Sequence, residues 1–230
     1  MAEKFVAFGS EALEFLAELQ DNNNKAWFAE NKARYEELVR EPARAFVRAM
    51  EKPLRKISRE LVADDRKVGG SLMRVYRDVR FGKDKTPYKT NIGIQFRHAL
   101  GKDVHAPGCY VHLGLDECFL GMGLWRPESA ALQKIREAIV EDPKAWKRVS
   151  TDPKLREVWE LGGESLKRPP RGFDKEHPLI DDLKRKDHIL VATLGVDEAQ
   201  SAELVELCLE RFERGKRHMR FLCEAIDVGF

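Results

Sequence analysis

The sequence I-G-I-Q-F-R-H, from Ile92 to His98, alternates apolar residues with smaller or more polar ones. A period of two is typical of a β-strand in a sheet that has one covered face and one wetter face. The same pattern recurs from Cys109 to Leu115, from Cys118 to Leu124 and, earlier in the chain, from Leu72 to Val79. Asp116-Glu117 fits a short hairpin turn. Short links between consecutive strands predict an antiparallel meander.

Helical periodicity flanks this region on both sides. Apolar residues recur at spacings of three and four through residues 10–63 and again through residues 127–228, and one further strand is expected near 188–194. Pro53 is expected to divide or kink a helix in the first part. We therefore predict a single α+β domain over residues 1–230. Its antiparallel meander of four to six strands, mainly from residues 71–125, has helices before and after it, packed mainly on one face.

The overall charge is close to neutral, with 41 basic residues against 39 acidic ones. The net charge therefore gives no argument for a nucleic-acid or membrane partner. No apolar run approaches the roughly 18–20 residues of a membrane-spanning helix, and residues 1–8 lack the long apolar centre of a signal peptide. These patterns predict a cytoplasmic protein.

The sequence contains no pattern typical of a metal or cofactor site. Its four cysteines are too far apart for a C-x-x-C motif and sit among apolar residues, so we interpret all four as reduced packing residues. Neither H-E-x-x-H nor a cluster of carboxylates is present. Gly121-Met122-Gly123 lacks the third glycine of a dinucleotide loop. We expect no metal and no cofactor.

Positive charge is concentrated in one segment, R-V-Y-R-D-V-R-F-G-K-D-K-T-P-Y-K, from Arg74 to Lys89. Residues 74–102 hold eight Lys and Arg against only Asp78 and Asp84. Guanidinium groups bind phosphate or carboxylate bidentately, and lysines add point charges. One interpretation is therefore an anion site, with the ligand-binding residues Arg77, Arg80, Lys83, Lys85, Tyr88 and Lys89.

Two other interpretations of this segment stay open. Asp78 and Asp84 could hold the arginines in a structural ion-pair network that fixes a long loop to the sheet. Alternatively, the run is a solvated loop. Strand alternation places Arg77 on the more apolar side of residues 72–80, where an arginine needs a partner.

Two histidines are further candidates. His112 is expected on a strand beside Tyr110 and is the one candidate for a catalytic general base, with a hydrogen-bonded core histidine as the alternative. His177 lies in P-R-G-F-D-K-E-H-P, from Pro170 to Pro178. This loop is either a lid that adds His177 to the ligand-binding residues or a proline-stiffened connector.

Four segments resemble an uncharacterised bacterial and fungal family, the domain of unknown function 2461. They are residues 23–35 with their Asn, Trp, Phe and Tyr residues, R-D-V-R-F-G-K-D-K-T-P-Y-K (77–89), G-L-W-x-P (123–127) and P-R-G-F-D-K-E-H-P (170–178). The similarity extends over residues 8–193. The activity of the family is not established, so the resemblance implies which segments matter without naming a reaction. Gly82 departs from the serine expected there, which argues against a role for a hydroxyl at that position.

We therefore expect a cytosolic protein that binds a small anionic ligand, such as a phosphorylated one, in a cleft formed by residues 77–89, His112 and the loop 167–178. The sequence is compatible with an enzyme and with a binding protein. One alternative is a nucleic-acid-binding module that uses the same basic face. Another is a protein-interaction domain in which the motif is an architectural ion-pair network.

Overall fold

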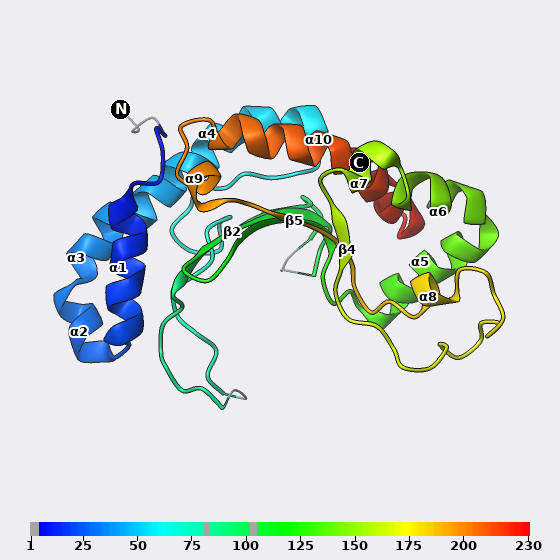
Figure 1. Cartoon of the computed structure of the whole chain (residues 1–230), viewed down its shortest axis with the longest axis horizontal. Coiled ribbons are helices and arrows are strands. Elements are labelled where there is room, and N and C mark those ends of the chain that lie inside the picture. The colour runs from blue at the N-terminus through cyan, green and yellow to red at the C-terminus, as the bar shows by residue number, and fades with distance from the viewer. Residues whose placement is uncertain (1–4, 81–82, 102–104) are drawn as a thin grey trace.

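An antiparallel sheet lies at the centre of the computed structural model, which describes residues 5–80, 83–101 and 105–230. Within these residues the sheet has five strands in the order β1-β2-β3-β5-β4 (Figure 1). The strands are β1 (Asn91–Arg97), β2 (Gly108–Gly114), β3 (Cys118–Leu124), β4 (Glu160–Gly162) and β5 (His188–Thr193). β1, β2 and β3 form the predicted meander, and β5 joins it by pairing with β3. The α+β prediction is confirmed.

The two faces of the sheet have different surroundings because side chains alternate along each strand. Ile92, Ile94 and Phe96 of β1 are almost fully buried on the face that α4 (Glu41–Ile57) and α10 (Leu204–Ala225) cover. Both helices cross above this face in Figure 1. The opposite face, which we call the open face, carries half-buried residues such as Tyr110 and His112. Helices therefore pack mainly on one face, as predicted.

The helices before the sheet are α1 (Ser10–Asp21), α2 (Lys25–Glu30), α3 (Lys32–Tyr35) and η1 (Glu36–Arg40), followed without a break by α4. η1 is a π-helical turn. We expected Pro53 to divide or kink a helix, and α4 continues through Pro53 to its last residue, so the proline does not divide it. Leu54 and Ile57 after the proline are buried in the core, and this packing holds the final turn in place.

The helices after the meander are α5 (Ser129–Glu141), α6 (Pro143–Ser150), α7 (Pro153–Arg156), α8 (Ile180–Leu183), α9 (Val196–Ala199) and α10. Most buried apolar residues form one cluster between the sheet, α1–α4 and α10. A second apolar cluster lies around Trp146 and Ile135, toward α5, α6 and α8. β4 was not predicted, and its three residues lie in a segment that reads as the end of a helical run.

One predicted strand is wrong. Residues 72–79 form no regular strand; they pair with their neighbours through the isolated bridges Leu72 with Ile94 and Tyr76 with Tyr88 and the backbone hydrogen bonds around these bridges. The alternation of residues was present, but the backbone bends at Val75 and Arg80 instead of following β1. All four cysteines are free and buried, as predicted. In the part of the chain that the structure describes, no helix is both long and apolar enough to span a bilayer.

Candidate anion-binding site

We call the segment from Arg74 to Lys89 the basic motif and its residues 77–86 the tip. Ion pairs within the motif itself hold the tip. Arg77 pairs with Asp84 and donates to the hydroxyl of Thr86 at 2.7 Å. Arg80 pairs with Asp78 through hydrogen bonds of 2.9 and 2.7 Å. Hydrogen bonds from Arg80 lower the pKa of Asp78, and hydrogen bonds from Thr86, followed by one from Arg77, lower that of Asp84. Both guanidinium groups therefore already bind carboxylates.

The lysines of the motif have three different environments. Lys85 donates from Nζ to the carbonyl oxygen of Val79 at 2.8 Å. Lys83 is exposed and makes no hydrogen bond or ion pair with another described residue. Lys89 is half-buried, and its burial, followed by the charges of Arg74 and Arg77, lowers the pKa of its ammonium group. Position 82, where the sequence carries glycine, lies outside the described residues.

Tyr88 anchors the motif to the N-terminal helices. Its ring stacks on Phe28 with the centroids 4.1 Å apart, and only 5% of the residue is exposed. Its backbone N–H donates to Oδ1 of Asn23, and Nδ2 of Asn23 donates to its carbonyl oxygen, each at 3.0 Å. Tyr88 therefore packs in the core. Its contacts join segment 23–35 to segment 77–89, two of the segments that resemble the family.

His112 lies on the open face of the sheet. Its Nδ1 is 3.2 Å from the hydroxyl of Tyr110, and its ring stacks on Phe119 with the centroids 4.6 Å apart. Burial lowers the pKa of His112, while the carboxylate of Glu117 opposes this change. Burial also raises the pKa of Tyr110 to about 12. Both side chains are therefore neutral near pH 7 and form a Tyr–His pair that faces away from α4 and α10.

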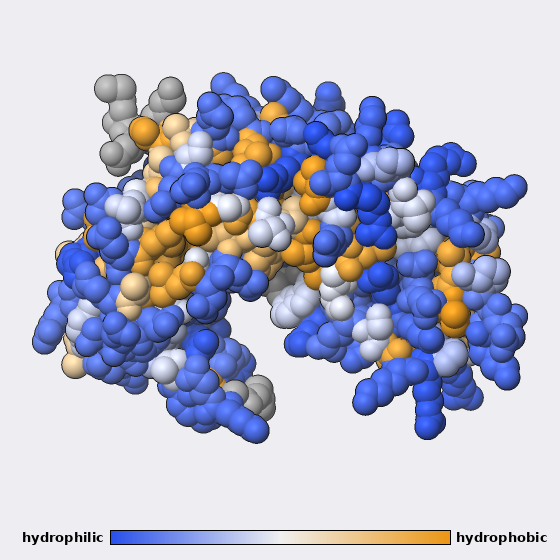
Figure 2. Space-filling model, in the orientation of Figure 1, coloured by the Kyte–Doolittle hydropathy of each residue, from blue (hydrophilic) through white to orange (hydrophobic). Residues whose placement is uncertain are grey.

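His177 is not brought together with the basic motif. Its Nδ1 accepts a hydrogen bond from the N–H of Leu179, and its loop lies toward α8, in yellow in Figure 1. The motif lies on the other side of the molecule, beyond the arch of the sheet. Figure 2 shows a hollow below the arch, between the motif and the loop, with hydrophilic residues along both flanks. The loop that contains His177 and the basic motif therefore lie on opposite sides of this hollow.

A cleft of about 520 Å³ opens at the root of the motif, between the end of the N-terminal helices and residues 66–76. We call it the basic cleft. No carboxylate is among its lining residues, whereas five of them are cationic: Arg40, Arg44, Arg66, Lys67 and Arg74. Its remaining walls include the rings of Tyr35 and Tyr76 and several apolar side chains. The cleft thus combines positive charge with aromatic surface.

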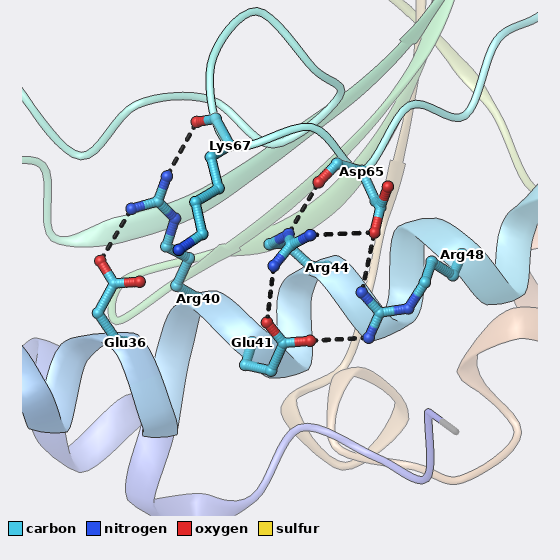
Figure 3. A network of polar contacts seen from close by, with 7 residues as sticks. All are labelled: Glu36, Arg40, Glu41, Arg44, Arg48, Asp65 and Lys67. Carbon is cyan, nitrogen blue, oxygen red and sulfur yellow. Dashed lines mark hydrogen bonds and ion pairs between the residues drawn. The ribbon is translucent and has the colours of Figure 1, made fainter. Parts of the chain in front are cut away.

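Acidic residues behind the cleft hold its arginines in place (Figure 3). Arg44 and Arg48 share the carboxylates of Glu41 and Asp65 at distances of 2.8 to 3.2 Å. Nε of Arg44 also donates to the carbonyl oxygen of Asp65 at 2.8 Å. This closed ring of two arginines and two acids fixes the 64–70 segment against α4. Side chains positioned in this way lose little entropy on binding a ligand.

Arg40 extends the same network toward the motif. It donates to Glu36 at 2.8 Å and to the carbonyl oxygen of Lys67 at 2.9 Å. The side chain of Lys67 runs down beside Arg40 in Figure 3, and no contact is drawn to its ammonium group. The seven residues of the network comprise four cations and three carboxylates. Positive charge is therefore in excess where Lys67 and Arg40 meet.

Three polar groups of the cleft have no partner within the described part of the chain. Lys67 and Arg74 make no side-chain hydrogen bond or ion pair there, and neither does the hydroxyl of Tyr35. Tyr35 is only 7% exposed. Its burial raises the pKa of the phenol to about 12, so the hydroxyl stays protonated and can donate a hydrogen bond into the cleft.

The π-helical turn η1 explains how Tyr35 and Arg40 line the same cleft. Residues five positions apart lie about 140° from each other around a regular α-helix. The wider π-helical turn of Glu36–Arg40 changes this relation, and Tyr35 directly precedes it. Single π-helical turns inside α-helices are frequent at functional sites. The local geometry therefore supports a site at this position.

Sequence reasoning missed most of the basic cleft. Arg74 lay within the predicted basic segment, but the other four cations come from α4, η1 and the loop before residue 70. One signal was available, because Arg40, Arg44 and Arg48 recur at four-residue spacing and so share one helix face. Tyr35 was noted only as part of the 23–35 segment that resembles the family.

No group of three or more His, Cys, Asp or Glu side chains suited to a metal ion exists among residues 5–80, 83–101 and 105–230. A comparison with curated proteins and one with solved structures each found no match. A comparison with protein-family models found one match, which covers residues 11–221. The matched range contains all four segments of the resemblance and the whole basic cleft. The chain therefore belongs to the family described as "Conserved hypothetical protein (DUF2461)".

Proposed function

We propose that this protein is a cytosolic binding protein for a small anionic ligand and that the ligand occupies the basic cleft. The observation that carries the proposal is the lining of the cleft, which has five cationic side chains and no carboxylate. Two of these cations, Lys67 and Arg74, have no partner within the described residues. Arginine and lysine side chains are the usual binders of phosphate and carboxylate groups. The free cysteines fit a reducing compartment.

The neighbouring groups favour a bound anion over an empty cleft. Arg40 is paired with Glu36, whereas Lys67 beside it has no carboxylate partner within the described residues, so a ligand anion at this point would neutralise the charge of Lys67. The Arg44–Glu41–Arg48–Asp65 ring keeps the arginines from folding back into the opening. A ligand phosphate or carboxylate would therefore meet donors that are already in position.

Binding of simple anions tests the proposal. Inorganic phosphate, pyrophosphate and citrate are titrated into the full chain, with affinity from calorimetry and stabilisation from the melting temperature. A ligand that binds only the folded state raises the melting temperature by mass action. We expect at least one of the three anions to bind, and Arg74→Gln to weaken that binding about tenfold or more, because hydrogen bonds to charged groups contribute about 1.5–3 kcal/mol.

Arg80→Gln is the matched control, because it removes the same side chain from the same motif at the tip, where Arg80 already pairs with Asp78. We expect it to change the affinity less than twofold. The proposal fails if none of the three anions binds, or if Arg80→Gln weakens binding as much as Arg74→Gln does.

The ion pairs at the tip favour an architectural role for Arg77 and Arg80, as in the protein-interaction alternative. The nucleic-acid alternative makes a different prediction. Several phosphate contacts would make the affinity for an oligonucleotide fall steeply as salt is raised from 50 to about 200 mM. A small-anion site with two or three contacts would show a much shallower dependence.

A further inference from the structure

We infer that the ligand of the basic cleft carries a flat aromatic ring as well as its anionic group, and that its chemical class is that of a nucleoside monophosphate. This inference rests on the proposed function. It assigns the ring to Tyr76 and the phosphate to the cations around Arg40 and Arg74. No reaction is part of it.

The size of the cleft argues against a bare inorganic ion as the whole ligand. Its volume of about 520 Å³ lies in the range of roughly 300–1,000 Å³ typical of pockets for drug-sized molecules. A single water occupies about 30 Å³ of liquid, so a phosphate ion would fill only a small part of the cleft. The remaining space lies between apolar and aromatic walls.

Tyr76 supplies a rigid stacking surface. It lines the cleft and is 53% exposed, which leaves a large part of its ring free for contact. Its ring is backed by Tyr88, with the centroids 5.5 Å apart, and Tyr88 in turn stacks on Phe28. An exposed tyrosine supported from behind in this way is the usual platform for a nucleobase, because every base has a flat π-face.

The apolar part of the lining lies along the same wall as Tyr76. Leu72, Met73 and Val75 precede Tyr76 in the wall, and Val68 adds a side chain that is 86% exposed. A cleft meant only for inorganic phosphate has no use for this surface. A ring would shield it from water, and about 25 cal/mol would be gained for each Å² of apolar area buried.

The cations and the aromatic platform lie close enough for one small molecule. The charge of Arg40 and the phenol of Tyr76 both act on the ionisation of Tyr35, which places all three groups near one another. Arg74 is two residues from Tyr76 and lines the same cleft. Tyr35 lines the cleft as well, and its hydroxyl makes no hydrogen bond to another residue in the described part of the chain. A ribose hydroxyl or a phosphate oxygen would satisfy it.

Four probes separate the ring from the phosphate: adenosine monophosphate, ribose 5-phosphate, adenosine and inorganic phosphate. Affinities are measured by calorimetry on the full chain. We expect adenosine monophosphate to bind about tenfold or more tightly than ribose 5-phosphate, because stacking on an aromatic side chain makes a contribution of that size. Adenosine without phosphate should bind weakly.

Variants of the two assigned residues sharpen this experiment. Tyr76→Ala should reduce the affinity for adenosine monophosphate to the level of ribose 5-phosphate and leave that of ribose 5-phosphate unchanged. Tyr76→Phe, the matched control, keeps the ring and should retain the wild-type preference. Arg74→Gln should weaken both phosphorylated probes by the same factor. Melting curves confirm that each variant is folded.

The outcomes distinguish this inference from the proposed function. If ribose 5-phosphate binds but adenosine monophosphate binds no more tightly, or if Tyr76→Ala weakens both equally, the ring assignment is overturned and the anion site stands. If none of the phosphorylated probes and no simple anion binds, both fail. If a single-stranded oligonucleotide binds far more tightly than adenosine monophosphate, with a steep salt dependence, the ligand is nucleic acid and the inference is again overturned.

Discussion

The basic cleft and the second apolar cluster both contain polar groups without partners, but in opposite surroundings. In the cleft, Lys67 and Arg74 border an open cavity. In the second cluster, Trp146, His188 and His218 are fully buried. Among the described residues, the indole N–H of Trp146 and both ring nitrogens of His188 have no hydrogen-bond partner. Burial lowers the pKa of each histidine to about 3, so both imidazoles are neutral at pH 7.

This difference shows which unsatisfied groups suggest a ligand. A cation that borders a cavity keeps its charge and can be satisfied by an anion that enters. A histidine in a closed core loses its charge instead, because desolvation penalises the protonated form. Accessibility therefore separates a candidate site from a feature of the core. The predictions below test the two regions, from the largest expected effect to the smallest.

Acid should destabilise the fold strongly through the buried histidines. Their folded pKa values of about 3 lie below the unfolded value near 6.5, so the stabilisation is complete above pH 6.5 and is lost as pH falls toward 3. Each histidine should contribute a slope of about 1.4 kcal/mol per pH unit in this window. Urea unfolding at pH 7, 6, 5 and 4 measures it.

His188→Leu and His218→Leu are the variants that test this assignment. Each should flatten the dependence between pH 6 and pH 5 by about one proton, since a leucine cannot be protonated. An unchanged slope in both would show that carboxylates, not these histidines, control the acid response. In that case the contrast between core and cleft would not hold.

Removing the acid that holds Arg44 of the cleft, together with Arg48 behind it, should have the next largest effect. Asp65→Ala deprives Arg44 and Arg48 of a shared carboxylate at 3.2 and 2.9 Å. Both guanidinium groups are about one fifth exposed, so we expect a loss of about 1–3 kcal/mol of unfolding free energy. Urea unfolding gives this value. A loss of less than about 0.5 kcal/mol would mean that the network does not fix the cleft wall.

Removing an acid at the tip of the motif should lower the unfolding free energy less than Asp65→Ala does. Asp84→Ala removes the partner of Arg77, but Asp84 is 58% and Arg77 is 40% exposed. Exposed pairs contribute little to stability, so the variant should stay folded and lose clearly less unfolding free energy than Asp65→Ala does in the same assay. Cooperative unfolding of Asp84→Ala at room temperature would show instead that the tip is essential to the architecture.

The smallest effect on stability is expected at Tyr35. Its hydroxyl has no partner in the described part of the chain, so Tyr35→Phe should change the unfolding free energy by less than about 0.5 kcal/mol. The affinity for a bound phosphate should nevertheless fall about two- to tenfold, as expected for one lost hydrogen bond. A destabilisation of more than 1 kcal/mol without any change in affinity would assign the hydroxyl to the fold.

Much of the fold could be predicted because its signals are local. The alternation of Ile92, Ile94 and Phe96 sets the buried face of β1, and similar patterns set β2, β3 and β5. β4 carries only one apolar residue, Leu161, in three positions, which is too short for a period to appear. Residues 72–79 show the alternation of a strand but form none. Alternation indicates which way the side chains point, and it does not show whether a neighbouring strand pairs with the backbone along its whole length.

The candidate site could be predicted only in part, for a related reason. The pairing of Arg77 with Asp84 and of Arg80 with Asp78 was among the interpretations offered by sequence, since each acid lies within seven residues of its arginine. The basic cleft joins residues from three separate segments, and only the packing of α4 against the 64–70 loop brings them together. The sequence drew attention to the basic segment of residues 74–89, and in the structure the basic cleft opens beside the start of that segment, at Arg74.

The π-helical turn η1 makes the cleft sensitive to chain length. The helix runs unbroken from Lys32 to Ile57, and a single π-helical turn within it is equivalent to one inserted residue. Deleting one residue between Glu36 and Arg40 would restore regular α-helix and rotate Tyr35 by about 100° relative to the residues of α4. If the deleted residue is not Arg40, all five cations of the cleft would remain. The hydroxyl of Tyr35 would nevertheless move out of the cleft. A relative shorter by one residue there could keep the chemistry of this site and lose its geometry.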